Sequence, residues 1–187
     1  MKKMKKIGLT LSVLALLLVV PFVMVGCGGG RGPSVAQLTE GRWELTSSSA
    51  DFRMTIAGEH LFDESITLTP GDPGWIAGWL EFTETTDGDN TFIGFGEDGN
   101  VSGTWTISGR TLVMTPPNLD MIDTELFEDF PNFRIEQLFT YRATINSDGT
   151  ELTLTNNVSL STSFMGIRMS IRVRSTEVFQ LATPDAA

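Results

Sequence analysis

Short runs in which apolar and polar residues alternate dominate the chain from residue 43 onward. Phe52, Met54 and Ile56 alternate with polar neighbours, and Trp105 and Ile107 do so in a later run. Successive side chains of a β-strand point to opposite faces, so this period predicts strands with one buried and one exposed face. The predicted strands are 43–46, 52–56, 66–69, 79–85, 91–95, 101–107, 110–115, 137–145, 151–155 and 167–174.

Turn-forming sequences separate many of these runs. They combine Asp, Asn, Ser and Gly at 86–90, 97–100, 108–109 and 146–149. Asp and Asn tolerate a left-handed backbone and glycine adopts positive φ without strain, so tight turns between antiparallel neighbours are expected. Short strands at this spacing predict an all-β fold, either a sandwich or a meander closing into a barrel of roughly eight strands. Closure is favoured because it removes exposed sheet edges.

One segment departs from the alternating pattern. Leu119, Ile122, Leu126 and Phe130 are spaced by three, four and four residues, which places them on one face of a helix. An asparagine at the start can cap this helix, and the proline after Phe130 ends it. We therefore predict one short helical insert, residues 118–130, that covers one end of the barrel.

The first 26 residues have the order of an export signal. Four lysines within the first six residues precede an apolar run over 7–25, and Gly26 comes directly before Cys27. Charge, apolar run and small residue follow one another in this way in secretory signals. The run is also long enough to span a bilayer as a permanent helix. Both interpretations place the rest of the chain outside the cytoplasm.

Met24-Val25-Gly26-Cys27 resembles the lipobox of bacterial lipoproteins. In that family the cysteine is acylated on sulfur, freed by cleavage and acylated again on its new amino group. The resemblance implies a signal peptide at 1–26, a lipidated Cys27 that starts a Gly-rich tether at 27–36, and a domain at 37–183. Acyl chains would then anchor the protein to a membrane of the cell envelope. Gly28, rather than Asp, follows the cysteine, which in that family goes with the outer membrane.

The acidic balance of the chain limits its partners. All four lysines precede Cys27, so the mature chain would keep nine arginines against 23 acidic residues, a formal net charge of −14. This argues against nucleic acid as a partner, because its binding requires a basic surface, and against a domain that lies on an anionic bilayer. Cys27 is the only cysteine, so no disulfide stabilises the fold, and the length suits one domain with one core.

Three sequence segments together carry a second resemblance, to the lipocalin-like domains of small bacterial lipoproteins. They are Gly41-Arg42-Trp43, Asp98–Leu112 and Ser147–Thr155. The resemblance implies an antiparallel barrel, typically of eight strands, with the Gly-x-Trp segment closing one end. It also implies apolar ligands in some members and no catalytic residues. In lipocalins an arginine late in the barrel packs on that tryptophan, and the candidates here are Arg168, Arg172 and Arg174.

Candidate catalytic and metal-binding groups are few. His60 is the only histidine and lies in Gly58–Leu61, which is predicted to be a loop. No motif surrounds it, so we predict that the protein is not an enzyme and holds no cofactor or metal. The acidic turns 86–90 and 97–100 offer oxygen ligands for weak calcium binding, but their spacing is not that of an EF-hand. Solvated turns without metal are the simpler interpretation.

Trp75–Phe82 is apolar on both faces, with Trp75 and Trp79 on the same side if the segment is extended. Such a segment is either a core strand beneath the helix or the aromatic wall of a ligand pocket. The candidate ligand-binding residues are Trp75, Trp79, Trp105, Leu126 and Phe130.

Arg168, Arg172 and Arg174 share one face of a predicted strand. They are either solvated and paired with acidic residues on neighbouring strands, or they form an anion-binding site.

Two classes of function remain. In the first, the lipoprotein binds a small apolar or amphipathic molecule inside its barrel; in the second, the barrel is filled by its own side chains and the protein is structural or an interaction protein. Eight strands enclose barely enough room for a ligand, so the strand count allows both. A cavity above roughly 300 Å³ would favour ligand binding.

Overall fold

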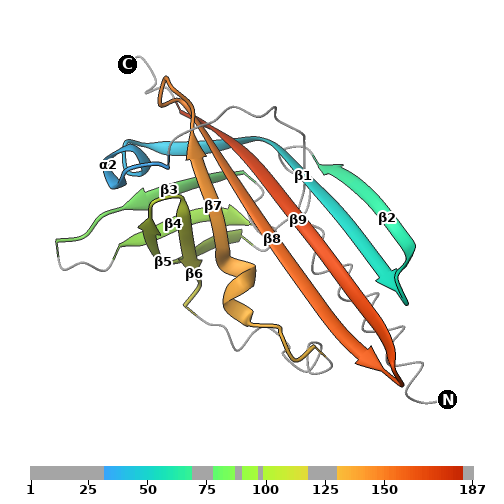
Figure 1. Ribbon diagram of the computed structural model, residues 1–187. Helices are drawn as coiled ribbons and strands as arrows, with labels where there is room; N and C mark the ends of the chain where they lie inside the picture. The colour runs from blue at the N-terminus through green and yellow to red at the C-terminus, as the bar shows by residue number, and fades with distance from the viewer. Residues whose placement is uncertain (1–31, 69–77, 87–89, 97–98, 118–129, 183–187) are drawn as a thin grey trace.

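One antiparallel β-sheet holds most of the chain (Figure 1). The computed structural model describes residues 32–68, 78–86, 90–96, 99–117 and 130–182. The predicted lipidation site Cys27 and nearly all of the predicted helical insert lie outside these residues. The candidate site residues Trp75 and Leu126 also lie outside them, as do all four acidic residues of the two turns considered for calcium.

The described chain contains nine strands and two short helices. The strands are β1 (Arg42–Ile56), β2 (Glu59–Leu68), β3 (Trp79–Thr83), β4 (Thr91–Gly96), β5 (Gly99–Ser108), β6 (Thr111–Thr115), β7 (Thr140–Ile145), β8 (Glu151–Phe164) and β9 (Ile167–Leu181). The helices are α2 (Val35–Leu38) and the 3-10 helix η3 (Ile135–Phe139).

Eight of the strands close into a ring. Strands β3 to β9 pair in chain order, and β1 then joins β3 on one side and β9 on the other. All of these pairs are antiparallel. The prediction of an all-β meander that closes into an eight-stranded barrel is confirmed.

Three strands continue well beyond the ring and form an arm (Figure 1). We use this name for β2 together with the distal halves of β1, β8 and β9, residues 48–56, 157–164 and 167–174. Strand β2 lies outside the ring. It pairs with Ser48–Ile56 of β1, on the same edge of β1 whose first residues, Arg42–Glu44, pair with β3. The arm is thus a four-stranded sheet in the order β2-β1-β9-β8.

A β-bulge in β1 changes which side chains of this strand face the core, so that different residues are buried in the ring and in the arm. The pairing of β1 with β9 shifts between Leu45 and Ser47, so one residue of β1 is left without a Cα partner there. The shift exchanges the side-chain faces of β1. Trp43 and Leu45 are buried before it, and Ser48 and Ala50 are buried after it.

Helix α2 closes one end of the ring. Ser34 caps the helix by accepting a hydrogen bond from the backbone N–H of Gln37, and the Gln37 side-chain oxygen accepts one from the backbone N–H of Ser34. The indole of Trp43 donates to the carbonyl of Leu38 at 2.9 Å, and both side chains are fully buried. The Gly-x-Trp segment therefore lies next to α2. Packed structure is present from the buried Pro33 onward.

Two apolar clusters form the core. The larger fills the ring and includes Trp43, Leu80, Phe92, Trp105, Leu112, Met114, Leu152, Leu154 and Phe179. The smaller lies on the inner face of the arm and consists of Phe130, Val158, Leu160, Ile171 and Val173, with half-buried Phe52, Met54, Phe133, Leu138 and Met169 around it. Each large side chain removed from water contributes about 1.5–3 kcal/mol, so both parts have their own hydrophobic stabilisation.

Several predicted strand bounds were wrong. The runs 43–46 and 52–56 belong to the single strand β1, because the serines between them are accommodated in the ladder. His60, which was assigned to a loop, pairs with Thr55 within β2. Strands β8 and β9 continue to Phe164 and Leu181. At 137–145 only Thr140–Ile145 is a strand, because the preceding residues form η3.

Candidate functional site

The described residues proposed for an apolar pocket do not share one site. Trp105 lies in the ring cluster, where its indole donates to the carbonyls of Thr91 at 2.9 Å and Thr83 at 3.3 Å. Phe130 lies in the arm cluster. Trp79 is half-buried in β3 beneath the guanidinium of Arg42, whose Cζ is 4.3 Å from the ring centroid. These three residues therefore lie apart, in the ring core, on the ring surface and in the arm, and their role in ligand binding stays a prediction.

Side chains fill the interior of the ring. Trp43, Phe92, Trp105 and Phe179 are each at most 2% exposed, and Phe82 packs edge-to-face on Trp105 with centroids 5.5 Å apart. Aliphatic side chains from β3, β6 and β8 complete the same cluster. This packing leaves the ring as a core in the part that the structure describes.

A layer of buried polar residues separates the two apolar clusters. It consists of Ser48, Tyr141, Asn156, Ser175 and Glu177, which register places opposite one another: Ser48 with Glu177, Ser175 with Asn156, and Asn156 with Tyr141. The Asn156 amide is satisfied, donating to the carbonyls of Gln137 at 2.8 Å and Thr140 at 3.0 Å. The sequence did not predict this layer. Its members on β8 and β9 occupy inward positions only when these strands are given their full length.

Glu177 is the unusual member of the layer. Its side chain is buried, and its Oε2 has no hydrogen-bond partner among the described residues. Burial raises the pKa of this carboxyl from its ordinary value of 4.5 to about 8, so the group is neutral over most of the acidic and neutral range. Burial also raises the pKa of Tyr141, and the Glu177 charge raises it further. A protonated Glu177 therefore suits the apolar surroundings better than a carboxylate.

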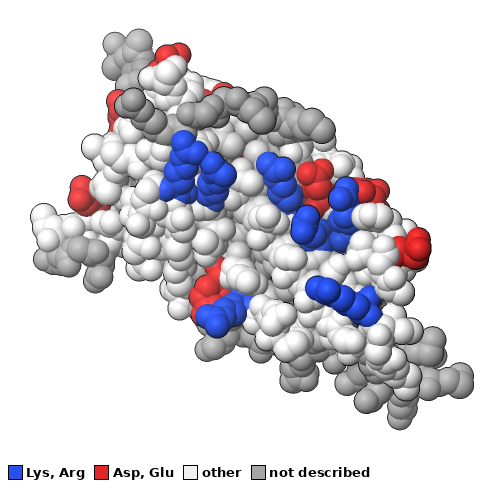
Figure 2. Space-filling model, viewed as in Figure 1, with Lys and Arg blue, Asp and Glu red and all other residues white. Residues whose placement is uncertain are grey.

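The three predicted anion-binding arginines lie together on the outer face of the arm. Arg168, Arg172 and Arg174 are exposed, while Ile171 and Val173 between them point into the core. The register pairs Arg174 with Asp51 and Arg172 with Arg53, and Arg53 itself forms an ion pair with Asp63 at 2.8 Å. Figure 2 shows basic side chains along the face formed by β7, β8, β9 and β1. Acidic side chains, among them Asp51 and Asp63, lie beside the arginines on the same face.

The same arginines do not pack on Trp43. That tryptophan faces the ring interior opposite Leu181, whereas Arg172 lies opposite Arg53, ten residues farther along β1. The contact implied by the lipocalin resemblance is therefore not formed by these three arginines. Arg42, the neighbour of Trp43, instead stacks on Trp79.

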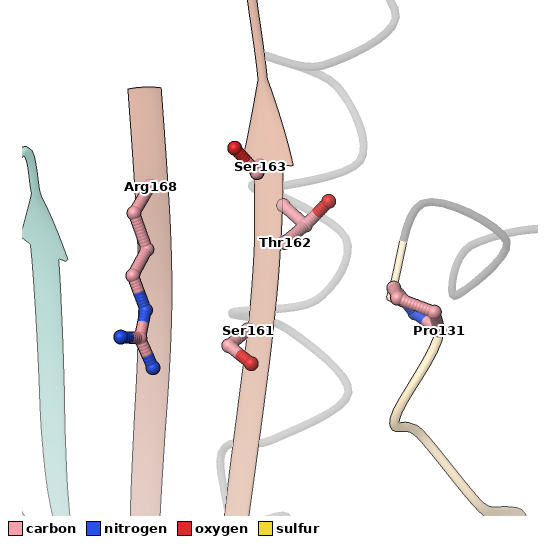
Figure 3. Close-up of a pocket in the computed structure, with 5 residues that line it drawn as sticks. All are labelled: Pro131, Ser161, Thr162, Ser163 and Arg168. Carbon is pink, nitrogen blue, oxygen red and sulfur yellow. The ribbon is translucent and has the colours of Figure 1, made fainter. Parts of the chain in front are cut away.

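A groove opens beside the distal half of β8 (Figure 3). It encloses about 290 Å³ and is lined by Pro131, Ser161, Thr162, Ser163 and Arg168. Apart from Pro131 and the Arg168 stem, its lining is hydroxylic, so it does not resemble an apolar ligand pocket.

Neither a catalytic constellation nor a metal cluster is present within the described residues. No group of three or more His, Cys, Asp or Glu side chains there could hold a metal ion. His60 is exposed on β2. Within the same ranges, no helix is both long and apolar enough to cross a bilayer.

Compared with known proteins, the chain matches no protein-family model, no curated protein and no solved structure. The eight-stranded closed barrel therefore rests on the strand pairing alone, and membership of the lipocalins or the lipoproteins stays a prediction from the sequence.

Proposed function

We propose that this protein is a lipid-anchored lipoprotein of the bacterial cell envelope and that it acts through its surface. The glycine after its cysteine assigns it to the outer membrane in this proposal. In this proposal it is not an enzyme. The observation that carries the proposal is the packed ring: Trp43, Phe92, Trp105 and Phe179 occupy the space that an internal ligand would need. Of the two functional classes, packing favours the structural or interaction protein.

The anchor in this proposal is Cys27, which follows an apolar run and precedes a glycine-rich stretch. Acyl chains contribute about 0.8 kcal/mol for each buried methylene, so two or more chains hold a protein on a membrane essentially permanently. The described chain then begins next to α2, at the closed end of the ring. The arm extends from the opposite end and is available for contacts.

The surface that supports an interaction role is the arm. It presents arginines on its outer face, and its β2 edge pairs with no strand among the described residues. The competing function, binding of a small apolar or amphipathic ligand, would require an internal cavity, and the 290 Å³ groove beside β8 is open and hydroxylic instead.

Mass spectrometry of the protein purified from membranes tests both parts of the proposal. We expect a diacylated or triacylated N-terminal Cys27 and, after solvent extraction, no stoichiometric small apolar molecule. The variant Leu154→Ala is the matched control for ligand capture, because it removes a fully buried side chain and opens an apolar void in the ring. An intact Met1 would contradict the anchor, and a co-purified ligand in the wild type would contradict the packed-ring function.

A further inference from the structure

The hairpin of β8 and β9 differs in charge from the rest of the protein. No acidic residue lies between Glu151 and Glu177, although the chain has 23 in total, and the same stretch carries Arg168, Arg172 and Arg174. The net charge of the whole chain therefore says little about this hairpin. Its distal half is positively charged and lies at the far end of the arm.

The tip of this hairpin exposes apolar side chains. Met165 is 88% exposed and Ile167 is 51% exposed. Met165 also has a positive φ of 51°, and Gly166 follows with 79°. Two-residue turns of this kind prefer Asn or Asp before Gly, because a large L-residue is strained in the left-handed region. A methionine here is unfavourable both for its backbone conformation and for its exposure, which points to a role for its side chain outside the fold.

The arginines follow directly behind the apolar tip. Arg168 is adjacent to Ile167, and Arg172 and Arg174 follow on the same outer face over about 20 Å of strand. Across the pair, β8 contributes Ser159 and Ser163 opposite Arg172 and Arg168. An apolar end followed by cations and hydroxyls matches the order of layers in a membrane surface, where acyl chains lie beneath phosphate headgroups.

We propose that the β8–β9 tip docks on an anionic lipid bilayer, with Met165 and Ile167 in the interfacial region and the arginine row on headgroup phosphates. Such surfaces attract arginine and hold exposed apolar side chains. The acidic side chains nearest the arginine row are Asp51, which lies opposite Arg174 and accepts a hydrogen bond from Ser65, and Asp63, which forms an ion pair with Arg53. Arg168 and Arg172 lie opposite serines on the β8 side, so the hairpin edge approaches a surface with these two arginines in front. A soluble polyanion would use the arginines alone and would leave the apolar tip without a role.

This contact is distinct from the Cys27 anchor. The described chain begins next to α2, and β1 then runs fifteen residues, about 50 Å, to the tip. Residue Ala57 at the end of β1 donates its N–H to the carbonyl of Arg168, which fixes the two hairpin ends side by side. The proposal rests on the proposed envelope location, because the anchor brings the domain to a membrane, and it adds a second attachment point.

The test uses the full chain in vesicles of phosphatidylglycerol and acyl-brominated phosphatidylcholine, in which bromine quenches only nearby indoles. The variant Met165→Trp adds a fluorophore at the tip, and its signal is read as the difference from wild type. We expect brominated lipid to remove about half or more of the added fluorescence. Ile93→Trp is the matched control, because Ile93 is 48% exposed on β4 in the ring, and its added fluorescence should be unaffected.

Arginine substitutions test the electrostatic part of the contact. In the Met165→Trp background, Arg172→Gln and Arg174→Gln should each lower the ratio of quenched to unquenched fluorescence of the tip tryptophan roughly fivefold. Arg42→Gln should leave this ratio unchanged. Vesicles without phosphatidylglycerol should lower the ratio in the same way. Circular dichroism of each variant verifies the fold, which exposed positions should leave intact.

Two results would overturn the proposal. The first is an unquenched tip in the anionic vesicles. The second is binding to dextran sulfate that depends on Arg172 and Arg174 while the tip stays unquenched, which would assign the face to a soluble polyanion. Mass spectrometry of Cys27 on the same preparation separates the two proposals, because an unacylated chain with a quenched tip contradicts the anchor alone.

Discussion

Replacing Glu177 by glutamine should change how the stability of the protein depends on pH. The carboxyl is only 2% exposed, its Oε2 has no partner among the described residues, and burial raises its pKa from 4.5 to about 8. Glutamine has nearly the same size and never carries the charge. The variant therefore removes the titration and keeps most of the packing.

The sign of the effect follows from proton uptake. Between pH 4.5 and pH 8 the folded protein keeps the Glu177 proton, whereas the unfolded chain releases it. The stabilisation is therefore fully present below pH 4.5 and is lost as the pH rises towards 8. Each pH unit in this window removes about 1.4 kcal/mol, so the full loss is roughly 5 kcal/mol.

Urea unfolding from pH 4.5 to pH 9 measures this dependence. The difference in the free energy of unfolding between Glu177→Gln and wild type should be small at the acid end and should grow in favour of the variant up to pH 8. The control Glu44→Gln changes an exposed residue of β1 and should show no such growth. A difference that stays constant across the range would refute the assignment of a buried neutral carboxyl.

Two further predictions concern packing. Gly103→Ala should lower the free energy of unfolding by about 1–3 kcal/mol in chemical denaturation, because the new Cβ would clash with the carbonyl oxygen of Thr115. The control Ser102→Ala changes an exposed residue and should have little effect. Equal losses of stability in the two variants would contradict the predicted clash. Leu160→Ala should lower the free energy of unfolding by about 2–5 kcal/mol, because Leu160 belongs to the arm cluster. Hydrogen exchange should become faster in the arm than in the ring, and equal acceleration in both would mean that the two clusters unfold together.

The local pattern predicted β3 to β6 well and located parts of β1, β7, β8 and β9. Alternation at Val101–Ile107 and the turn residues at Ser108-Gly109 identify the β5–β6 hairpin, because period and turn chemistry are short-range properties. Closure of the sheet could be predicted only from the general argument that a closed barrel has no exposed edges. The pairing of Trp43 with Leu181 that achieves it joins distant parts of the chain, and no local pattern specifies it.

The arm and the polar layer could not be predicted in the same way. Distal β8 has polar residues on its outer face and buried Val158 and Leu160 on the other, and its serines and asparagines gave a weak strand signal. Glu177 resembles a solvated carboxylate in the sequence because acidic residues usually are exposed. Only the register, which places it between Ser48 and Leu154, shows that it is buried.

Ring closure between the first and last strands has a consequence for how the chain folds. Trp43 meets Leu181 across nearly the whole length of the domain, so the pairing of β1 with β9 has a high contact order and forms slowly. The hairpins from β3 to β8 can form as the chain emerges, and β1 can pair with β2 and β3 along one edge, but its other edge stays unpaired until β9 arrives. The ring therefore stays open during synthesis, and it closes only after Leu181 has been added and can pair with Trp43.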